Sequence, residues 1–204
     1  MSGGQLFDRQ SGFKGDALSP QPHDVALGYR DTVDRVLRKN FEDATIEQRE
    51  DAARDLILTC ALATAGLTLQ PIPGLEHAAI PVQVGMVAGL AHVFGDKLSR
   101  KNAREVLLDL GATTGVNLLG RQALTTVGKI VFPGIAGVLA APSMFALTWG
   151  TGHTATHYFR AGRQVDRATL KAIFERERRR SKTHYNERAA RSARPATADV
   201  ERGS

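Results

Sequence analysis

The chain has 204 residues, of which 42% are apolar and 24% are charged, close to the average of soluble globular domains. This length supports one domain with a buried core and flanking segments. The single cysteine, Cys60, excludes an intrachain disulfide and a cysteine-based zinc site. The formal net charge of +6 arises at the C-terminal side, because residues 160–204 carry 13 Lys and Arg against 6 Asp and Glu, whereas the preceding residues carry 14 against 15.

The flanking segments are expected to be disordered. Residues 1–23 are rich in Gly, Ser, Gln and Pro, and they lack the basic and then apolar pattern of a secretory signal. We expect a helical domain over residues 24–182 and a disordered basic tail over residues 183–204. The expected location is the cytoplasmic membrane, or the cytoplasm with peripheral attachment to that membrane.

Two helices are expected at the start of the domain. From Val25 onward, apolar residues recur at helical spacing. The tetrapeptide TIEQ, residues 45–48, has the form of a capping box, in which Thr45 and Gln48 satisfy each other's free backbone amides. The second helix begins there and is apolar over residues 56–69.

A hairpin turn is expected next, at QPIPG. Pro71 and Pro73 cannot continue the helical hydrogen-bond ladder, so they end the second helix. Gly74 permits a tight backbone turn, and the acid Glu76 marks the tip of the hairpin as polar. The apolar run of residues 78–94 then resumes as a helix that closes at a glycine.

The remaining elements are also predicted to be helical. Residues 99–110 are amphipathic with Leu107 and Leu110 inward, and Asp166 has the position of an N-cap for a final helix. Between these helices, residues 130–159 contain no Lys, Arg, Asp or Glu. No segment alternates as a strand does. The prediction is an all-α fold, a compact bundle of about six helices with glycine-rich hairpins and no sheet.

Pairs of glycines spaced four residues apart point to close helix packing. One pair is Gly85 and Gly89, and the other is Gly111 and Gly115. Small residues at this spacing let two helix backbones approach each other, which is how helices associate in lipid. The same spacing also suits tight packing in a soluble bundle, so it does not distinguish the two environments.

Three apolar segments approach the roughly 20 residues that a membrane-spanning helix requires. Residues 56–75 are cut by two prolines, and residues 77–95 are diluted by a proline, a glutamine and two histidines. Residues 130–149 are the strongest candidate, although they contain two prolines as well. None of the three is an uninterrupted apolar span.

The final helix carries a basic run. Its side chains would lie against anionic lipid headgroups, at about 1 kcal/mol for each basic group near the surface. The run consists of Arg176, Arg178, Arg179, Arg180 and Lys182. A solvated charged face is the alternative. A nucleic acid partner is not favoured, because the tail lacks interleaved aromatic residues apart from Tyr185.

The motifs that resemble catalytic or metal sites are incomplete. HTATH places His153 and His157 one helical turn apart, as in zinc proteases, but Thr154 stands where that chemistry requires a glutamate. Cys60 lies in an apolar run without an activating base, and no paired carboxylates are evident. We therefore predict a protein that is not an enzyme and has no metal or cofactor.

The chain resembles a bacterial family, domain of unknown function 697 (YcjF-like). The break PIPG, then Gln83, Met86 and the closing Phe94-Gly95, is similar to the central pattern of that family. The stretch HYFRAGRQVDRATLKAIF is similar to its ending, an aromatic pair and a glycine before a helix. The resemblance covers residues 47–182.

The resemblance implies a partner and not a reaction. Domains of this family often follow a small GTPase domain or are encoded beside one, and some members are membrane proteins. This chain has no GTPase motif, so the resemblance implies a GTPase-like partner on a separate protein. No catalytic residue is established for the family, so none carries over.

Three functions remain open. The first is a non-enzymatic, membrane-associated helical adaptor, with residues 56–95 and 130–149 at the membrane and the GTPase-like partner on the polar face of the first helices. The second is a soluble all-α protein-interaction domain with the hairpin buried in its own bundle. The third is a small pore-forming effector that inserts conditionally. A homo-oligomer is compatible with each of them.

Overall fold

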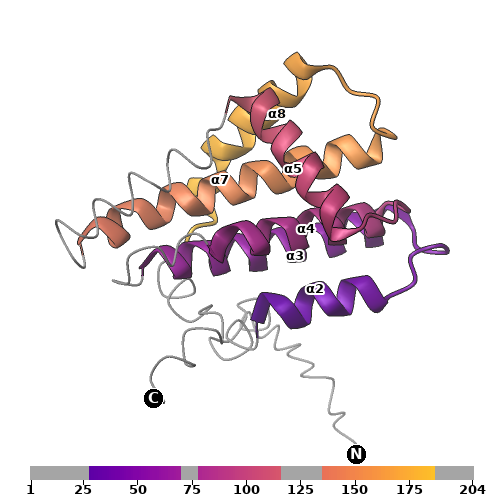
Figure 1. Ribbon diagram of the computed structural model, residues 1–204, viewed down its shortest axis with the longest axis horizontal. Helices are drawn as coiled ribbons and strands as arrows, with labels where there is room; N and C mark the ends of the chain where they lie inside the picture. The colour runs from indigo at the N-terminus through magenta and orange to yellow at the C-terminus, as the bar shows by residue number, and fades with distance from the viewer. Residues whose placement is uncertain (1–27, 70–77, 116–134, 187–204) are drawn as a thin grey trace, which may run out of the picture.

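The computed structural model describes residues 28–69, 78–115 and 135–186, which contain six α-helices, one 3-10 helix and no strand. The helices are α2 (Gly28–Arg38), α3 (Ile46–Leu69), α4 (Ala79–Val93), α5 (Arg100–Thr114), α7 (Ile135–Arg160), α8 (Arg167–Arg180) and the 3-10 helix η2 (Ser181–Thr183). The predicted all-α bundle is confirmed for these residues. Figure 1 shows α3, α4 and α7 side by side, with α2 on one side and α5 and α8 on the other.

The two longest helices, α3 and α7, are antiparallel. Glu50, near the start of α3, forms an ion pair with Arg160, the last residue of α7. Further along α3, the hydroxyl oxygens of Thr64 and Thr148 lie 2.9 Å apart in the buried contact between the two helices. α7 remains helical through Pro142. The ion pair and the threonine contact together place the start of α3 beside the end of α7.

α4 is also antiparallel to α3. The guanidinium of Arg49, near the start of α3, donates a hydrogen bond to the carbonyl oxygen of Val93 at the end of α4, at 3.1 Å. About two turns later in α3, Leu56 packs against Gly89. The shared antiparallel arrangement means that α4 and α7 both end at the level where α3 begins.

Two of the predicted helix starts are confirmed by their hydrogen bonds, whereas the predicted start of the first helix at Val25 lies outside the described residues. The backbone amide of Thr45 donates to Gln48 Oε1 at 3.1 Å, and the amide of Gln48 donates to Thr45 Oγ1 at 3.3 Å, which completes the capping box. At α8, the Asp166 carboxylate accepts a hydrogen bond from the backbone amide of Thr169 at 2.9 Å. These caps satisfy amides that have no carbonyl partner in the first helical turn.

α4 and α7 end with the same backbone motif. The amide of Asp96 donates to the carbonyl of Ala91 at 2.8 Å, and the amide of Gly95 donates to that of His92 at 3.1 Å. This pair of bonds is a Schellman motif, which requires a left-handed residue, and Gly95 has a φ of 90°. α7 ends in the same way at Gly162, where φ is 60°.

α8 packs back along α7 in the antiparallel sense. Phe174, in the middle of α8, lies against Gly150 of α7. After η2, the ring of His184 stacks on that of Trp149, with centroids 4.5 Å apart. The C-terminal end of α8 therefore lies beside the middle of α7.

Candidate functional site

Charged side chains are segregated along the bundle. Residues 56–69 of α3, all of α4 and residues 135–159 of α7 contain no Lys, Arg, Asp or Glu. Because α3 is antiparallel to α4 and α7, the uncharged part of α3 lies beside the starts of α4 and α7, and we call this end of the three described helices the charge-free end. The opposite, charged end holds the start of α3 and the ends of α4 and α7.

The charge-free end exposes large apolar side chains near the start of α7. Val138 is 37% exposed and Leu139 is 74% exposed, the highest value for a large apolar residue in the described part of the chain. Leu108 of α5 is also exposed, at 48%, but it lies between charged residues of α5. Adjacent exposed apolar side chains in an uncharged stretch of a helix are typical of a binding face.

Only one helix within the described residues, α3, is long and apolar enough to cross a membrane, and 72% of its apolar stretch is buried inside the protein. The sequence alone ranks residues 130–149 first. Of that segment, residues 135–149 belong to α7, and the rest lies outside the described residues. By length and composition, then, the candidate span is α3, which is also the central core helix.

An aromatic cluster lies at the inner boundary of the charge-free end. The rings of Phe145 and Trp149 on α7 stack with centroids 5.7 Å apart. His184 stacks on Trp149, and Tyr185 meets Phe145 edge-on with centroids 5.4 Å apart. These contacts hold the chain that follows η2 against α7, so the basic end of α8 lies at this boundary.

Three of the five basic residues predicted to contact anionic lipid pair with acids on their own helix. Arg176 and Arg180 both bind Glu177 Oε1, at 2.8 and 3.5 Å. Arg178 binds Glu175 Oε2 at 2.9 Å. At 100° per residue the four arginines also spread around α8, so they do not form a single basic face.

The other two basic residues are exposed. Arg179 and Lys182 have no ion pair within the described residues, and they flank the end of α8 and η2. No acid of the described residues pairs with either of them. They lie a few residues before His184 and Tyr185, which belong to the aromatic cluster.

The residues that carry the family resemblance in α4 are structural. Gln83 and Met86 are 1% and 0% exposed, and Gln83 Nε2 donates to the Thr148 hydroxyl of α7 at 2.9 Å. Phe94 is the C-cap of α4, and Gly95 supplies the left-handed conformation that ends the helix. This part of the pattern therefore holds α4 in the core and sets where it ends.

The first glycine pair accommodates neighbouring helices. A Cβ atom on Gly89 would lie 2.7 Å from Leu56 Cδ2 of α3, so glycine permits that close contact. A Cβ on Gly85 would lie 3.7 Å from the Val33 methyl groups of α2, which is an ordinary contact distance. α2 thus packs on the glycine face of α4.

The second glycine pair lies at the end of α5. Gly115 is exposed with a φ of 73°, and its amide donates to the carbonyl of Gly111. A Cβ at Gly115 would meet no atom within 4 Å, so the backbone conformation explains the glycine there and close packing does not.

Two further glycines, on α7, make helix contacts as close as that of Gly89. The glycine spacing used in the sequence analysis does not identify them. A Cβ on Gly150 would lie 2.9 Å from the Phe174 ring of α8, and one on Gly152 would lie 2.6 Å from Ile57 Cγ1 of α3. In the sequence, these two glycines stand two residues apart in WGTG, residues 149–152. These glycines lack the four-residue spacing of a small-residue pair because they face two different helices.

The predicted hairpin turn lies outside the described residues. α3 ends at Leu69 and α4 begins at Ala79, so the interval contains all four turn residues. These are Pro71, Pro73, Gly74 and Glu76. Their roles stay predictions.

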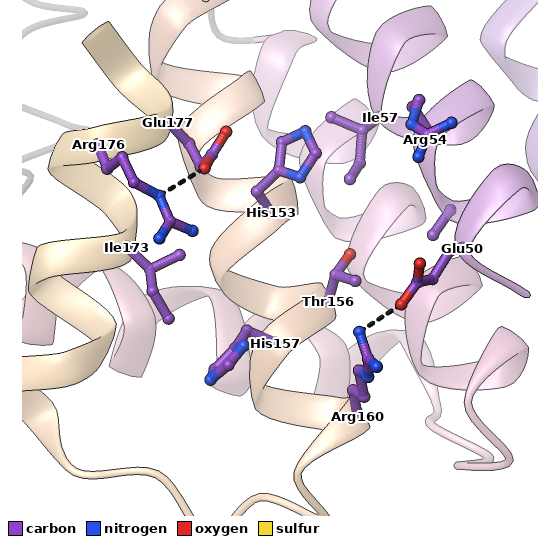
Figure 2. A pocket seen from close by; sticks show the side chains of 11 residues that line it. Glu50, Arg54, Ile57, His153, Thr156, His157, Arg160, Ile173, Arg176 and Glu177 are labelled. Carbon is purple, nitrogen blue, oxygen red and sulfur yellow. Dashed lines mark hydrogen bonds and ion pairs between the residues drawn. The ribbon is translucent and has the colours of Figure 1, made fainter. Parts of the chain in front are cut away.

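A polar pocket with a cavity volume of about 190 Å³ opens between α3, α7 and α8 towards the charged end (Figure 2). Its polar lining comprises Glu50 and Arg54 of α3, His153, Thr156, His157 and Arg160 of α7, and Arg176 and Glu177 of α8. Ile57 and Ile173 form apolar walls. Both histidines of HTATH therefore line one pocket, while the described residues contain no cluster of three metal-ligating side chains.

Two buried polar atoms in this pocket have no hydrogen-bond partner among the described residues. They are Nε2 of His153 and Oγ1 of Thr156. Burial lowers the pKa of His153 below its ordinary value, although the nearby carboxylate of Glu177 opposes that effect. His153 is therefore a neutral imidazole at neutral pH. The centroid of its ring lies 4.7 Å from that of the Trp149 ring.

A comparison with protein-family models matches residues 33–183 to a family described as domain of unknown function (DUF697). The chain belongs to the DUF697 family. No curated protein and no solved structure matches the chain. The DUF697 match starts within α2 and ends at η2, so it includes both ends of the bundle and the polar pocket. It also extends the similar region found in the sequence back over most of α2.

Proposed function

We propose that this DUF697 protein is a non-enzymatic helical adaptor that rests on the cytoplasmic membrane by its charge-free end and works with a separate GTPase-like partner. The observation that carries the proposal is the segregation of charge. The uncharged half of α3 lies beside the uncharged starts of α4 and α7, although α7 is far from α3 in the sequence. A domain that is solvated equally on all sides has no need of such an arrangement.

The depth of the charge-free end suits one leaflet. Residues 135–144 of α7 precede the aromatic cluster, and at 1.5 Å per residue they extend about 15 Å, half of a hydrocarbon core of about 30 Å. Leu139 lies within this length and is exposed. The apolar stretch of α3 is mostly buried by its neighbours, so we favour resting on the membrane over spanning it.

The groups at the boundary suit the headgroup region. Aromatic side chains and exposed cations are favoured at this depth because they combine an apolar body with a polar or charged end. Trp149 is only 4% exposed and Tyr185 is half-buried, so the boundary groups that can reach the headgroups are the exposed Arg179 and Lys182 at the end of α8. Each of these cations would add about 1 kcal/mol on an anionic surface.

Vesicle flotation with a matched pair of variants tests membrane binding. The protein should float with vesicles of phosphatidylethanolamine and phosphatidylglycerol. Leu139→Glu should reduce the bound fraction by about tenfold or more, because a buried leucine contributes about 1.5–3 kcal/mol. Leu108→Glu, on the charged face of α5, should bind as the wild type does. Equal binding of all three proteins would remove the charge-free end from the interface.

A soluble protein-interaction domain is the second candidate, and the burial of α3 favours it. Fractionation of the expressed, untagged protein separates the two. Retention in the membrane pellet through high salt and carbonate washes supports insertion of the charge-free end, whereas release by salt alone assigns the attachment to the basic residues. A protein that never enters the pellet supports the soluble domain.

The GTPase-like partner is proposed from the family resemblance, and we place it on the groove between α2 and α3. This groove has a volume of about 550 Å³ and is lined by Arg35 and Lys39 on one side and Asp51 and Asp55 on the other. It lies on the polar face of the first two helices. A partner can therefore reach it while the charge-free end is occupied.

The partner proposal is tested with purified small GTPases encoded near this gene, loaded with a GTP analogue or with GDP. Binding that depends on the nucleotide and is lost in Asp55→Lys supports the proposal. Glu105→Lys, on the exposed face of α5, is the control for the change in net charge. Binding that ignores both the nucleotide and Asp55→Lys would contradict it.

A further inference from the structure

We propose that the polar pocket between α3, α7 and α8 binds a small oxyanion, either the carboxylate or the phosphate group of a small molecule. The pocket is separate from the charge-free end and from the groove between α2 and α3. The inference therefore goes beyond the adaptor function and stands independently of it.

The pocket contains hydrogen-bonding atoms without partners among the described residues. A buried polar atom without a partner costs about 1–3 kcal/mol, so a site that keeps two of them is unusual unless something binds there. His153 Nε2 and Thr156 Oγ1 are such atoms among the described residues, and Figure 2 shows both side chains at the same cavity.

The Thr156 hydroxyl makes no hydrogen bond to its own helix within the described residues. Buried threonines in helices commonly donate to the carbonyl three or four residues earlier. Thr154, two residues before on α7, donates to Gly150 O at 2.7 Å, and Thr68 donates to Thr64 O at 3.0 Å. Thr156 lines the pocket and makes no such bond within the described structure, so no protein group competes with a ligand for its buried hydroxyl.

The charge of the pocket favours an anion. Three guanidinium groups, those of Arg54, Arg160 and Arg176, line it against two carboxylates. Both carboxylates are already engaged, Glu50 by Arg160 and Glu177 by Arg176. The ion pairs neutralise two of the arginines, so among the lining residues one positive charge is in excess, that of Arg54, whose own partner Asp51 does not line the pocket.

Arg54 is the cation most free to bind a ligand. Its ion pair with Asp51 is 3.1 Å long and joins side chains that are 62% and 71% exposed, so it contributes little and is readily exchanged. A guanidinium presents a planar set of donors that matches a carboxylate or a phosphate. Together with the Thr156 hydroxyl and the Nε2–H tautomer of His153, it supplies donors from two helices.

The volume limits the ligand to a few atoms beyond the oxyanion. A water molecule occupies about 30 Å³ of liquid, and drug-sized ligands fill about 300–1,000 Å³. The pocket, at about 190 Å³, lies between these limits. Its walls of Ile57 and Ile173 leave room for a short apolar portion of the ligand.

The test is an NMR titration of the full chain with inorganic phosphate and, separately, with acetate, at constant ionic strength maintained with chloride. We expect a saturable shift of the His153 ring signal by one of the two anions, in the millimolar range. Thr156→Val, which removes only the hydroxyl, should weaken that binding by about tenfold. Thr154→Val is the control, because that hydroxyl bonds to its own helix, and it should bind as the wild type does.

The pH dependence provides an independent readout. The charged and titratable groups around His153 are Glu50 and Arg54 on α3, Arg176 and Glu177 on α8, His157 and Arg160 on α7, and His184 after η2. An anion bound at Nε2 stabilises the imidazolium, so saturating phosphate or acetate should raise the pKa of His153.

Three outcomes would overturn the proposal. If neither anion gives a saturable shift, the pocket holds water only. If chloride alone gives the same shift, the response is charge screening. If Thr154→Val and Thr156→Val weaken the binding equally, the anion does not lie against the Thr156 hydroxyl.

Discussion

Gln83 Nε2 donates a hydrogen bond to the Thr148 hydroxyl at 2.9 Å, across the fully buried contact between α4 and α7. The same hydroxyl lies 2.9 Å from Thr64 Oγ1, and Thr64 donates to the carbonyl of Ala61 at 3.0 Å. Because Thr64 uses its proton on Ala61, Thr148 must donate to Thr64. One chain of hydrogen bonds therefore links the three central helices in a fixed direction.

Thr148→Val should destabilise the protein by about 1–3 kcal/mol, because it leaves the Gln83 amide buried without an acceptor. The free energy of unfolding in urea measures this change. Adding Gln83→Leu should restore part of the loss, since the double variant no longer buries that amide. A single variant as stable as the wild type would show that the bond contributes nothing net.

Gly152→Ala should cost about 1–3 kcal/mol through overpacking, because the new Cβ would lie 2.6 Å from Ile57 Cγ1 in the α3–α7 contact. Gly85→Ala is the control, since its Cβ would meet Val33 at 3.7 Å, and helix propensity should then stabilise it by about 0.5–1 kcal/mol. Thermal melting of both variants measures the two changes in stability. Equal shifts in the same direction would contradict the packing argument.

Gly95→Ala should lower stability by about 1–2 kcal/mol, because an alanine at a φ of 90° is strained. Gly95→Asn should cost less, because asparagine adopts the left-handed region more readily than alanine does. The unfolding free energies of the two variants give the comparison. If alanine is tolerated as well as asparagine, the Schellman motif does not depend on glycine here.

Arg49→Lys should loosen the loop between α2 and α3. The guanidinium donates to the carbonyls of Phe41 at 2.6 Å, Ala44 at 3.2 Å and Val93 at 3.1 Å, and a lysine cannot reach all three. We expect a loss of about 1–3 kcal/mol and faster amide exchange in the loop. Arg54→Lys, at an exposed ion pair, should change stability by less than about 1 kcal/mol.

His153 should make the protein less stable at acidic pH. Burial, the largest cause, lowers its pKa in the folded protein below the ordinary 6.5, so below that pH the unfolded chain binds the proton more readily. This contribution to stability is complete above pH 6.5 and is lost as the pH falls through the folded pKa. His153→Gln should flatten the stability profile below pH 6.5, whereas His157→Gln, at an exposed position, should retain it.

Local signals in the sequence predicted the helices and many of their ends. The capping box of Thr45 and Gln48, the N-cap Asp166 and the closing Gly95 each act within a few residues, so the pattern alone is sufficient to identify them. The five basic residues of α8 show the limit of such reading. Their acids lie on the same helix, but only the side-chain geometry reveals which cations are already paired.

The polar pocket could not be predicted from the sequence. Its lining comes from three helices, and Glu50 and Arg160, which form an ion pair there, are 110 residues apart in the sequence. HTATH signalled two histidines on one helical face, but not that Thr156 between them would keep a free hydroxyl. That property depends on where α3 and α8 leave space beside α7.

The sequence by itself determined the helical class, the break between α3 and α4, and the absence of charge from three long stretches, because these depend on local geometry and composition. Only the tertiary structure decided that the uncharged part of α3 lies beside the starts of α4 and α7 and that the charged ends surround a pocket. The antiparallel packing of α3 against α4 and α7 sets both outcomes, and it rests on contacts such as Ile57 with Gly152, which no local pattern encodes.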